Sequence, residues 1–265
     1  MKRGTDVKGY YLGVDIGSLT TKVVLLEPGG RLVARAVQRS GYRGREVAEK
    51  LIAGLLGKTG TSRGEIRATV ATGYGRITFP ADREVTEISC QARGVARLCP
   101  GARTVVDVGG QDSKVVKLLP NGRVLDFVMN DKCAAGTGRF LEVMAQALEL
   151  SLDDLGDLAG QARHETPISS TCTVFAESEV VSHLAQGAER TDIVAGLCTS
   201  VASRVAALVS RVGLERDVVM TGGVARNLGV VRALAAKLGA PVLVPDDPTV
   251  TAAYGAALYA RDLTP

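Results

Sequence analysis

Two short polar loops contain the residues whose types and spacing best suit phosphate binding. The first, residues 15–22 (DIGSLTTK), places an aspartate, a glycine, three hydroxyl side chains and a lysine in a tight hairpin between two apolar runs. Glycine lets the backbone approach a phosphate closely, and the carboxylate of Asp15 suits a hydrated Mg2+ ion. Taken alone, an ordinary hairpin with a polar tip fits this segment equally well. The residues expected to hold phosphate oxygens are Gly17, Ser18, Leu19, Thr20, Thr21 and Lys22.

The second loop, residues 107–114 (DVGGQDSK), repeats this arrangement later in the chain. Gly109 and Gly110 are expected to contact phosphates, and Asp107 to manage Mg2+ and water together with the first aspartate. Gln111 is suited to orient an attacking water, as glutamines do in other nucleotide hydrolases. Two such loops facing each other across a cleft would clamp the phosphates of ATP and its Mg2+. Neither loop matches a Walker P-loop or a GxGxxG fingerprint, so those folds are disfavoured. The predicted catalytic residues are Asp15, Asp107 and Gln111.

A third loop, residues 221–227 (TGGVARN), follows an apolar strand and opens a helix. Gly222 and Gly223 let the backbone approach a flat ligand, and a helix N-terminus suits a phosphate or ribose oxygen. A tight strand-to-helix turn would have the same composition. Together with the two hairpins, however, the loop favours a nucleotide site, with both glycines near the nucleoside.

The hydrophobic pattern places these loops in two similar halves, each beginning with three strands. This internal duplication predicts an α/β protein of two lobes, residues 1–102 and 103–265, with the final helix expected to pack back on the first lobe. The acidic segment 152–157 is expected to be a solvated turn. Strands are predicted at 10–16, 20–26, 31–38, 66–72, 104–108, 114–119, 123–128, 217–220 and 242–244, and helices at 44–56, 88–98, 137–148, 174–186, 191–212, 228–238 and 249–260.

The composition is that of an ordinary globular protein. Of the 265 residues, 46% are hydrophobic and 23% are charged, which argues against a disordered or fibrous chain. A net charge of +4 is too small to indicate a nucleic-acid partner. The chain shows no long uncharged apolar run, and its first residues lack the apolar core of a signal peptide. We therefore expect a cytoplasmic protein with neither a membrane nor a nucleic acid as partner.

Five cysteines are scattered along the chain, at 90, 99, 133, 172 and 198. The odd number and the absence of a CxxC pair disfavour a disulfide framework and a zinc ribbon, so buried core thiols are the default expectation. Cys133 and Cys172 each precede a predicted helix, whose positive N-terminal end favours a thiolate.

The three loops and two cysteine segments together resemble a known family. The loops are similar to those of the actin, sugar kinase and Hsp70 ATPase superfamily. The segments DKCAAGTG (131–138) and CTVFAES (172–178) narrow the resemblance to the BadF/BadG/BcrA/BcrD ATPase family, especially to the activators (component A) of 2-hydroxyacyl-CoA dehydratases. The resemblance runs from about Tyr10 to Tyr259 and implies the duplicated actin/sugar kinase/Hsp70-like (ribonuclease H-like) fold, with a nucleotide cleft between the lobes.

What the resemblance implies for function is an ATP hydrolase that donates single electrons at low potential. Cys133 and Cys172 would ligate a 4Fe-4S cluster. Because a cubane cluster usually takes four thiolates, one cluster would bridge a homodimer. Cys90, Cys99 and Cys198 would remain core thiols. A ferredoxin or flavodoxin would reduce the cluster, and a 2-hydroxyacyl-CoA dehydratase or a related CoA-ester reductase would accept the electron.

The chain departs from the family at the edge of the expected nucleotide pocket. Many members carry Glu or Gln where Thr249 stands, and Gly where Ala252 stands. Thr249 is nevertheless expected to line the pocket, because the segment around it is similar to a family segment that does.

Three alternatives remain open from the sequence. One is an ATPase subunit of a benzoyl-CoA reductase or of a double-cubane cluster protein system, which shares the chemistry and differs in the partner. Another is a small-molecule kinase of the same superfamily, which would need a substrate-binding insertion and a catalytic base. The third is a nucleotide-sensing interaction module without turnover.

Overall fold

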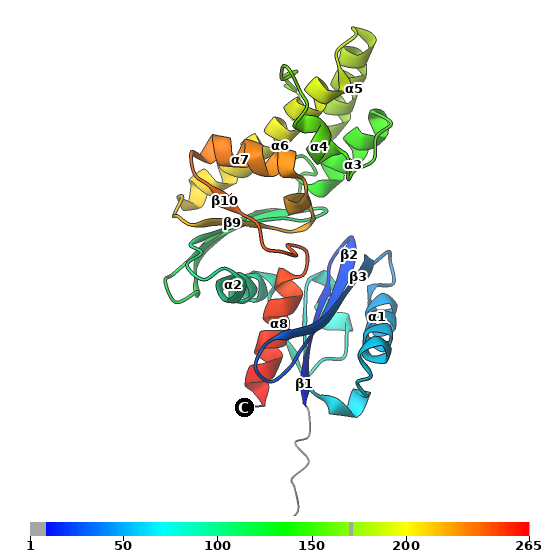
Figure 1. The fold of residues 1–265 in the computed structure, drawn as a ribbon, viewed down its shortest axis with the longest axis vertical. Coiled ribbons are helices and arrows are strands. Elements are labelled where there is room, and N and C mark those ends of the chain that lie inside the picture. The colour runs from blue at the N-terminus through cyan, green and yellow to red at the C-terminus, as the bar shows by residue number, and fades with distance from the viewer. Residues whose placement is uncertain (1–8, 170–171, 265) are drawn as a thin grey trace, which may run out of the picture. The chain divides into compact units, whose positions relative to one another are not determined.

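The computed structural model describes residues 9–169 and 172–264, and these form two compact units. Unit 1 contains the chain up to Leu98 together with the segment from Val250 onward, and unit 2 is Cys99–Thr249. The sequence pattern divides the chain between 102 and 103, whereas contacts divide it between Leu98 and Cys99 and assign the terminal helix to unit 1. Each unit is built around one five-stranded mixed sheet (Figure 1).

Unit 1 contains the first of these sheets, with strand order β3-β2-β1-β4-β5. The first three strands pair antiparallel, and the last two add on in parallel. The strands are β1 (Tyr10–Ile16), β2 (Thr20–Leu26), β3 (Leu32–Arg39), β4 (Ile66–Thr72) and β5 (Arg83–Glu84). The helices are α1 (Gly44–Thr59), α2 (Glu87–Leu98) and α8 (Thr251–Leu263).

Alternation along the central strands explains why both faces of this sheet are apolar. Leu12 and Val14 belong to the cluster that includes Ile52 of α1, while Tyr11 and Val24 belong to the cluster formed with α8. When both faces of a strand are covered, its sequence is a nearly continuous hydrophobic run, and β1 has such a sequence.

Helix α8 lies against β1 and α2 because small residues line its contacts. A methyl group on Gly13 of β1 would lie 2.0 Å from the carbonyl oxygen of Ala253, and one on Gly255 would lie 1.8 Å from that of Cys90. Gly94 of α2 makes an equally close approach, to the carbonyl of Thr251. These backbone approaches, possible only for glycine, explain why the last helix belongs to unit 1.

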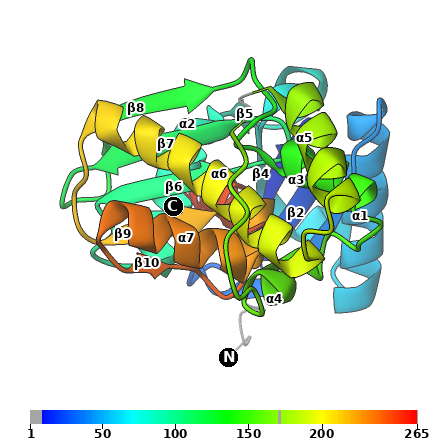
Figure 2. The same ribbon diagram turned by 90° about the horizontal axis from the view of Figure 1, so that it is seen from above.

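Unit 2 repeats the strand pattern in a sheet of order β10-β9-β6-β7-β8. Figure 2 shows α6 and α7 lying across this sheet. The strands are β6 (Thr104–Val108), β7 (Ser113–Leu118), β8 (Val124–Asn130), β9 (Val218–Thr221) and β10 (Val242–Leu243). The helices are α3 (Gly138–Ala147), α4 (Leu155–Ala159), α5 (Thr173–Ala185), α6 (Arg190–Val212) and α7 (Leu228–Leu238).

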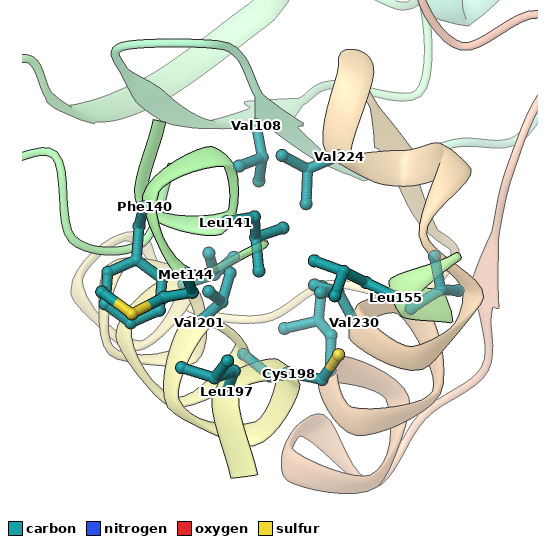
Figure 3. Packing of buried hydrophobic residues seen from close by; sticks show 14 of the residues in the cluster. Val108, Phe140, Leu141, Met144, Leu155, Leu197, Cys198, Val201, Val224 and Val230 are labelled. Carbon is teal, nitrogen blue, oxygen red and sulfur yellow. The ribbon is translucent and has the colours of Figure 1, made fainter. Parts of the chain in front are cut away.

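The core of unit 2 lies where α3, α6 and α7 meet the sheet (Figure 3). By length and composition α6 could cross a membrane, but half of its most apolar window is buried inside the protein. Its inward face packs in this core, as the helical spacing of its apolar residues predicts. Side chains at the centre include Phe140, Leu141, Met144, Leu197 and Val201.

Among the elements that the sequence pattern misses are the short helix α4 and the short strand β5. The segment 152–157, expected to be a solvated turn, is a turn only as far as Asp154, because α4 begins at Leu155 and buries that side chain completely. Strand β5 consists of two residues and carries no hydrophobic signal. Both elements are shorter than the windows over which periodicity can be read.

Candidate functional site

The first hairpin holds Asp15 at the end of β1, paired across the sheet with Lys22 on β2 and Thr72 on β4. The ammonium of Lys22 donates a 2.9 Å hydrogen bond to Oδ2 of Asp15, whose side chain is almost fully buried. The other carboxylate oxygen, Oδ1, is buried and has no hydrogen-bond partner among the described residues. A buried carboxylate oxygen without a partner costs free energy, which a bound ion and its water would recover. Because Mg2+ prefers a carboxylate together with water, the Asp15 site fits the expected ion.

The tip of this hairpin is open, and its base is fixed. The Gly17 amide donates to the Thr20 carbonyl at 3.1 Å, and residues 17–20 are partly exposed. Thr21 is fully buried, and its hydroxyl shares a 2.9 Å hydrogen bond with that of Ser40. The Ser40 hydroxyl in turn donates to the Gly17 carbonyl at 2.8 Å. Thr21 thus supports the base of the loop through Ser40, while Ser18, Leu19 and Thr20 are partly exposed.

The second hairpin repeats this pairing with one additional charge. Asp107 on β6 is opposite Lys114 on β7 and Thr221 on β9, the same register as in unit 1. The Thr221 hydroxyl donates to Oδ1 of Asp107 at 3.0 Å. The Lys114 ammonium is 2.8 Å from Oδ2 of Asp112 and 3.7 Å from Oδ2 of Asp107. All four side chains are buried, so this hairpin holds two carboxylates against one ammonium.

The three remaining predicted residues of this hairpin lie at its tip. The Gly109 amide donates to the Asp112 carbonyl at 2.9 Å, the counterpart of the Gly17 bond in unit 1. Gly109 and Gly110 are partly exposed, and Gln111 is exposed. The Gln111 amide is therefore free to approach a ligand or a water at the tip.

The duplication extends to a second loop in each unit, which sequence reasoning missed in unit 1. Gly73 follows Thr72 at the end of β4, and Gly222 follows Thr221 at the end of β9. Both glycines have a positive φ, 82° and 84°, and both precede a 3₁₀ turn, Tyr74–Thr78 in unit 1 and Gly223–Arg226 in unit 2. The missed signal was a Thr-Gly pair closing an apolar strand, present in both halves.

The loop predicted to lie near the nucleoside, which contains Gly222 and Gly223, lies beside Thr249 in the structure. The Gly222 amide donates to the carbonyl of Pro248 at 2.9 Å, which places the next residue, Thr249, beside this loop. Thr249 is held by Asp247, whose Oδ1 accepts from both its amide and its hydroxyl. A methyl group on Gly223 would meet none of the described residues within 4 Å beyond its chain neighbours. Gly223 therefore borders space that a ligand can occupy.

Cys133 and Cys172 are both exposed, and they differ in setting. Cys172 is the residue immediately before α5. Cys133 lies in the loop after β8, five residues before α3 begins at Gly138, so unlike Cys172 it does not directly precede its helix. Residues 170 and 171, next to the second cysteine, lie outside the described residues.

The other three cysteines are buried or partly buried. Burial raises the pKa of the Cys90 and Cys198 thiols to about 12. Cys99 follows α2 and is partly buried, and its pKa is raised by burial and then by the nearby charge of Asp246. Among the described residues no group of three or more His, Cys, Asp or Glu side chains could hold a metal. One chain thus offers two accessible thiols, which fits half the ligand set of a cubane cluster.

Two units with the same strand order and the same Asp-Lys-Thr register define a duplicated ATPase fold of the actin and sugar kinase type. A solved ROK family glucokinase from Streptomyces griseus shares this fold, with a TM-score of 0.61 at 14% identity over 96% of this chain and 100% of the other.

The chain belongs to the BadF/BadG/BcrA/BcrD ATPase family, whose model matches residues 12–260. It is 53% identical to a 2-hydroxyisocaproyl-CoA dehydratase activator from Clostridioides difficile, over 96% of this chain and 95% of the relative. It is 52% identical to an activator of lactoyl-CoA dehydratase from Anaerotignum propionicum, over 96% and 98%. A solved 2-hydroxyisocaproyl-CoA dehydratase activator from Clostridium difficile with bound ADPNP superposes with a TM-score of 0.92, at 52% identity over 96% and 95% of the two chains.

Proposed function

We propose that this protein is an ATP-dependent activator that delivers single electrons to a 2-hydroxyacyl-CoA dehydratase. One observation carries the proposal: a chain with two matching Asp-Lys-Thr sites also presents two exposed thiols, Cys133 and Cys172, while its other cysteines are buried or partly buried. The names of the relatives at 52–53% identity support the choice of partner.

The two hairpins take part in holding the phosphates of ATP. The partly exposed residues 17–20 and 109–110 border the phosphates, Ser18 and Thr20 supply hydroxyls, and Lys22 adds a cation. Asp15 keeps a buried oxygen, Oδ1, for a water of the metal shell, and Asp107 is fixed by the Thr221 hydroxyl. Gln111 orients the attacking water. Mg2+, when bound, would supply charge stabilisation at the phosphates.

Cys133 and Cys172 would be the thiolate ligands of a 4Fe-4S cluster. A bound cluster supplies one-electron redox chemistry. Since each chain offers two ligands, two chains share one cluster in a homodimer. Exposed apolar side chains beside Cys172 support an interface there: Val174 and Phe175 are 65% and 69% exposed, in the first turn of α5. A monomer rarely leaves such side chains grouped in water.

Nucleotide binding can change the cluster only by favouring one conformation of the protein over another. In this proposal a ferredoxin or flavodoxin would be the electron donor, and ATP binding and hydrolysis by the protein would drive delivery of the electron to the dehydratase. The exposed thiols need a reducing compartment, which supports a cytoplasmic location. Neither a membrane nor a nucleic acid takes part.

Anaerobic purification with iron and sulfide assays tests the proposal. We expect a dimer with about four iron atoms per two chains. Cys133→Ser and Cys172→Ser should each lose the iron and still bind ATP. The matched control is Cys99→Ser, which changes a partly buried thiol and should keep the iron. An iron-free monomer that still hydrolyses ATP, or iron retained in either ligand variant, would refute the electron-transfer function.

A second candidate keeps the chemistry and changes the partner. The chain is also 31% identical to one of the subunits of benzoyl-CoA reductase from Thauera aromatica, over 93% of this chain and 91% of the relative. Supplying the reduced protein with purified 2-hydroxyacyl-CoA dehydratase or with the remaining benzoyl-CoA reductase subunits separates the two. We expect ATP-dependent turnover with the dehydratase.

A further inference from the structure

The second hairpin and the loop that carries Cys133 share one residue, Ser113. Ser113 is the first residue of β7 and pairs with Asn130, the last residue of β8. Its buried hydroxyl donates to the carbonyl of Gly136 at 2.5 Å. Asn130 and Gly136 flank the segment 131–135, and Cys133 is the central residue of that segment. Ser113 therefore closes the cysteine loop at both ends, once through its backbone and once through its side chain.

The cysteine itself is tied to the same frame. The side-chain amide of Asn130 donates to the carbonyl of Cys133 at 2.9 Å. Beyond the cysteine the loop becomes fully buried at residues 135–137, and the Thr137 hydroxyl donates to the carbonyl of Ala134 at 2.6 Å. Only the part around Cys133 faces solvent, so its position follows from these anchors.

The tip of the hairpin makes a second connection, to the start of α3. The amides of Gly138 and Arg139 donate to the carbonyls of Gly109 and Gly110 at 2.9 and 2.8 Å. A methyl group on Gly138 would lie 3.1 Å from the Gly109 oxygen, so the two backbones are in direct contact. The residues expected to hold phosphate are thus bonded to the helix that follows the cysteine loop.

The duplicated hairpin of unit 1 is connected differently. Thr21 occupies the position of Ser113, but its hydroxyl bonds to Ser40, and the Ser40 hydroxyl returns to Gly17 of the same hairpin. In unit 1 these hydroxyl hydrogen bonds therefore begin and end in the same hairpin. In unit 2 the hydroxyl hydrogen bond extends to the segment that carries a cysteine. The difference between two otherwise matching hairpins indicates a role for Ser113 beyond support of the loop.

We propose that Ser113 is a positioning residue that couples the nucleotide state of residues 107–114 to the position of Cys133. The inference rests on the proposed function, since it takes this hairpin as a nucleotide-binding element. A ligand that moves the Gly109 and Gly110 carbonyls shifts the start of α3, and Ser113 carries the same movement to both ends of the cysteine loop.

The test measures the rate at which iodoacetamide alkylates Cys133 in the iron-depleted full chain, followed by peptide mass spectrometry. The rate is taken without nucleotide and with a non-hydrolysable ATP analogue plus Mg2+, and Cys172 in the same sample is the internal reference. A hydrogen bond that differs between two states biases them on the order of fivefold. We expect a nucleotide effect of that size on Cys133 in the unmodified chain.

The variants separate coupling from a general loss of structure. Ser113→Ala should bring the nucleotide effect on Cys133 close to one, and Ser113→Thr, which keeps the hydroxyl, should restore it. Ser210→Ala is the matched control, because its exposed hydroxyl donates to the carbonyl of Ala206 within the same helix, α6. Should Ser113→Ala fail to fold, Asn130→Ala removes the next bond of the same path, from the strand partner of Ser113 to the Cys133 carbonyl, and should reduce the effect as well.

In the anaerobically purified holoprotein, the rate of iron removal by a ferrous chelator should follow the same order among the variants. The inference is overturned, and the proposed function is not, if the nucleotide effect is unchanged in Ser113→Ala. The same holds if a bound analogue leaves the alkylation rate of Cys133 in the unmodified chain unchanged. Failure of the analogue to bind the unmodified chain, measured by calorimetry, overturns the proposed function and the inference with it.

Discussion

Thr221 donates its hydroxyl hydrogen to Oδ1 of Asp107 at 3.0 Å, which joins the ends of two neighbouring parallel strands. Both side chains are buried, and the other carboxylate oxygen faces the Lys114 ammonium at 3.7 Å. The Asp107 carboxylate is thereby held in one orientation before any ligand arrives. Positioned groups of this kind reduce the reorganisation that a reaction needs.

Replacing Thr221 with valine should weaken both folding and hydrolysis. The substitution keeps the branched shape and removes the Thr221 hydroxyl bond to the buried Asp107 carboxylate, which costs about 1–3 kcal/mol of the free energy of unfolding. Urea unfolding and the rate of phosphate release measure the two effects. Thr221→Ser keeps the hydroxyl and should recover most of both. Full activity in Thr221→Val would show that the orientation of Asp107 does not limit hydrolysis.

The buried thiol of Cys198 should make the protein less stable in alkaline solution. Burial raises its pKa from 9.0 to about 12, and its Sγ donates weakly to Oδ1 of Asn227 at 3.7 Å. Above pH 9 the unfolded chain releases this proton and the folded chain retains it. The contribution of the thiol is therefore complete below pH 9 and is lost as the pH rises towards 12, by about 1.4 kcal/mol per pH unit.

Urea unfolding of the unmodified chain and of Cys198→Ala at pH 8 and pH 10 checks this slope. The alanine variant starts less stable because it loses buried volume, but between these pH values it should lose about 1.4 kcal/mol less than the unmodified chain. Titrating tyrosines and lysines are common to both proteins and cancel in the comparison. Parallel losses in the two proteins would mean that the folded thiol ionises like a free one.

Glu149 lies in the left-handed region, with φ 55°, and offers a site for stabilisation. It follows the C-terminal end of α3, where the Leu150 amide donates back to the carbonyl of Ala145 at 2.9 Å. Glycine adopts this conformation without a Cβ penalty, so Glu149→Gly should raise the free energy of unfolding by about 0.5–1 kcal/mol. The change also removes an exposed ion pair with Arg190, 3.7 Å apart. Such pairs contribute little.

Thermal unfolding of Glu149→Gly and Glu149→Ala separates the two effects. Alanine loses the same ion pair and keeps the Cβ, so only the glycine variant should melt above the unmodified chain. Equal melting temperatures for glycine and alanine would show that the backbone at this position carries no strain.

Much of the fold follows from local patterns in the sequence. The run from Tyr10 to Ile16 is bounded by turn residues, and the structure has a strand over the same range. Helix α6 differs from its predicted range by one residue, because its apolar spacing continues from Ile193 to the last residue, Val212. The place of α8 depends instead on close approaches such as that of Gly255 to Cys90, which become visible only when the partner helix is known.

The parts of the candidate site that the sequence predicts are those whose motif occurs twice in the chain. The hairpins beginning at Asp15 and Asp107 stand out because one chain contains the pattern twice. Thr72 and Gly73 were missed because a two-residue pair is too short to recognise without the register that places it beside Asp15. The path from Ser113 to Cys133 depends on the pairing of β7 with β8 and on a buried side-chain bond, neither of which sequence spacing encodes.

Gly222 and Gly223 are adjacent, but substitution by alanine should lower the free energy of unfolding at Gly222 and leave it unchanged at Gly223. At Gly222, φ is 84° and the new methyl group would lie 2.3 Å from the carbonyl oxygen of Val108, a backbone atom that cannot move aside. Gly222→Ala should therefore lose about 2 kcal/mol or more of folding free energy. At Gly223 the methyl group meets none of the described residues within 4 Å beyond its chain neighbours, so Gly223→Ala should fold like the unmodified chain.

ATP affinity then shows whether the space beside Gly223 belongs to the nucleotide. If the ligand approaches this backbone, the methyl group in Gly223→Ala should raise the Kd for a non-hydrolysable ATP analogue by roughly tenfold, the equivalent of about 1.4 kcal/mol. Gly57→Ala, also in open space but on the exposed side of α1, is the matched control and should leave the Kd unchanged. Calorimetric titration of the three proteins decides the point. An unchanged Kd in a well-folded Gly223→Ala would remove this loop from the nucleotide site and leave phosphate binding to the two hairpins.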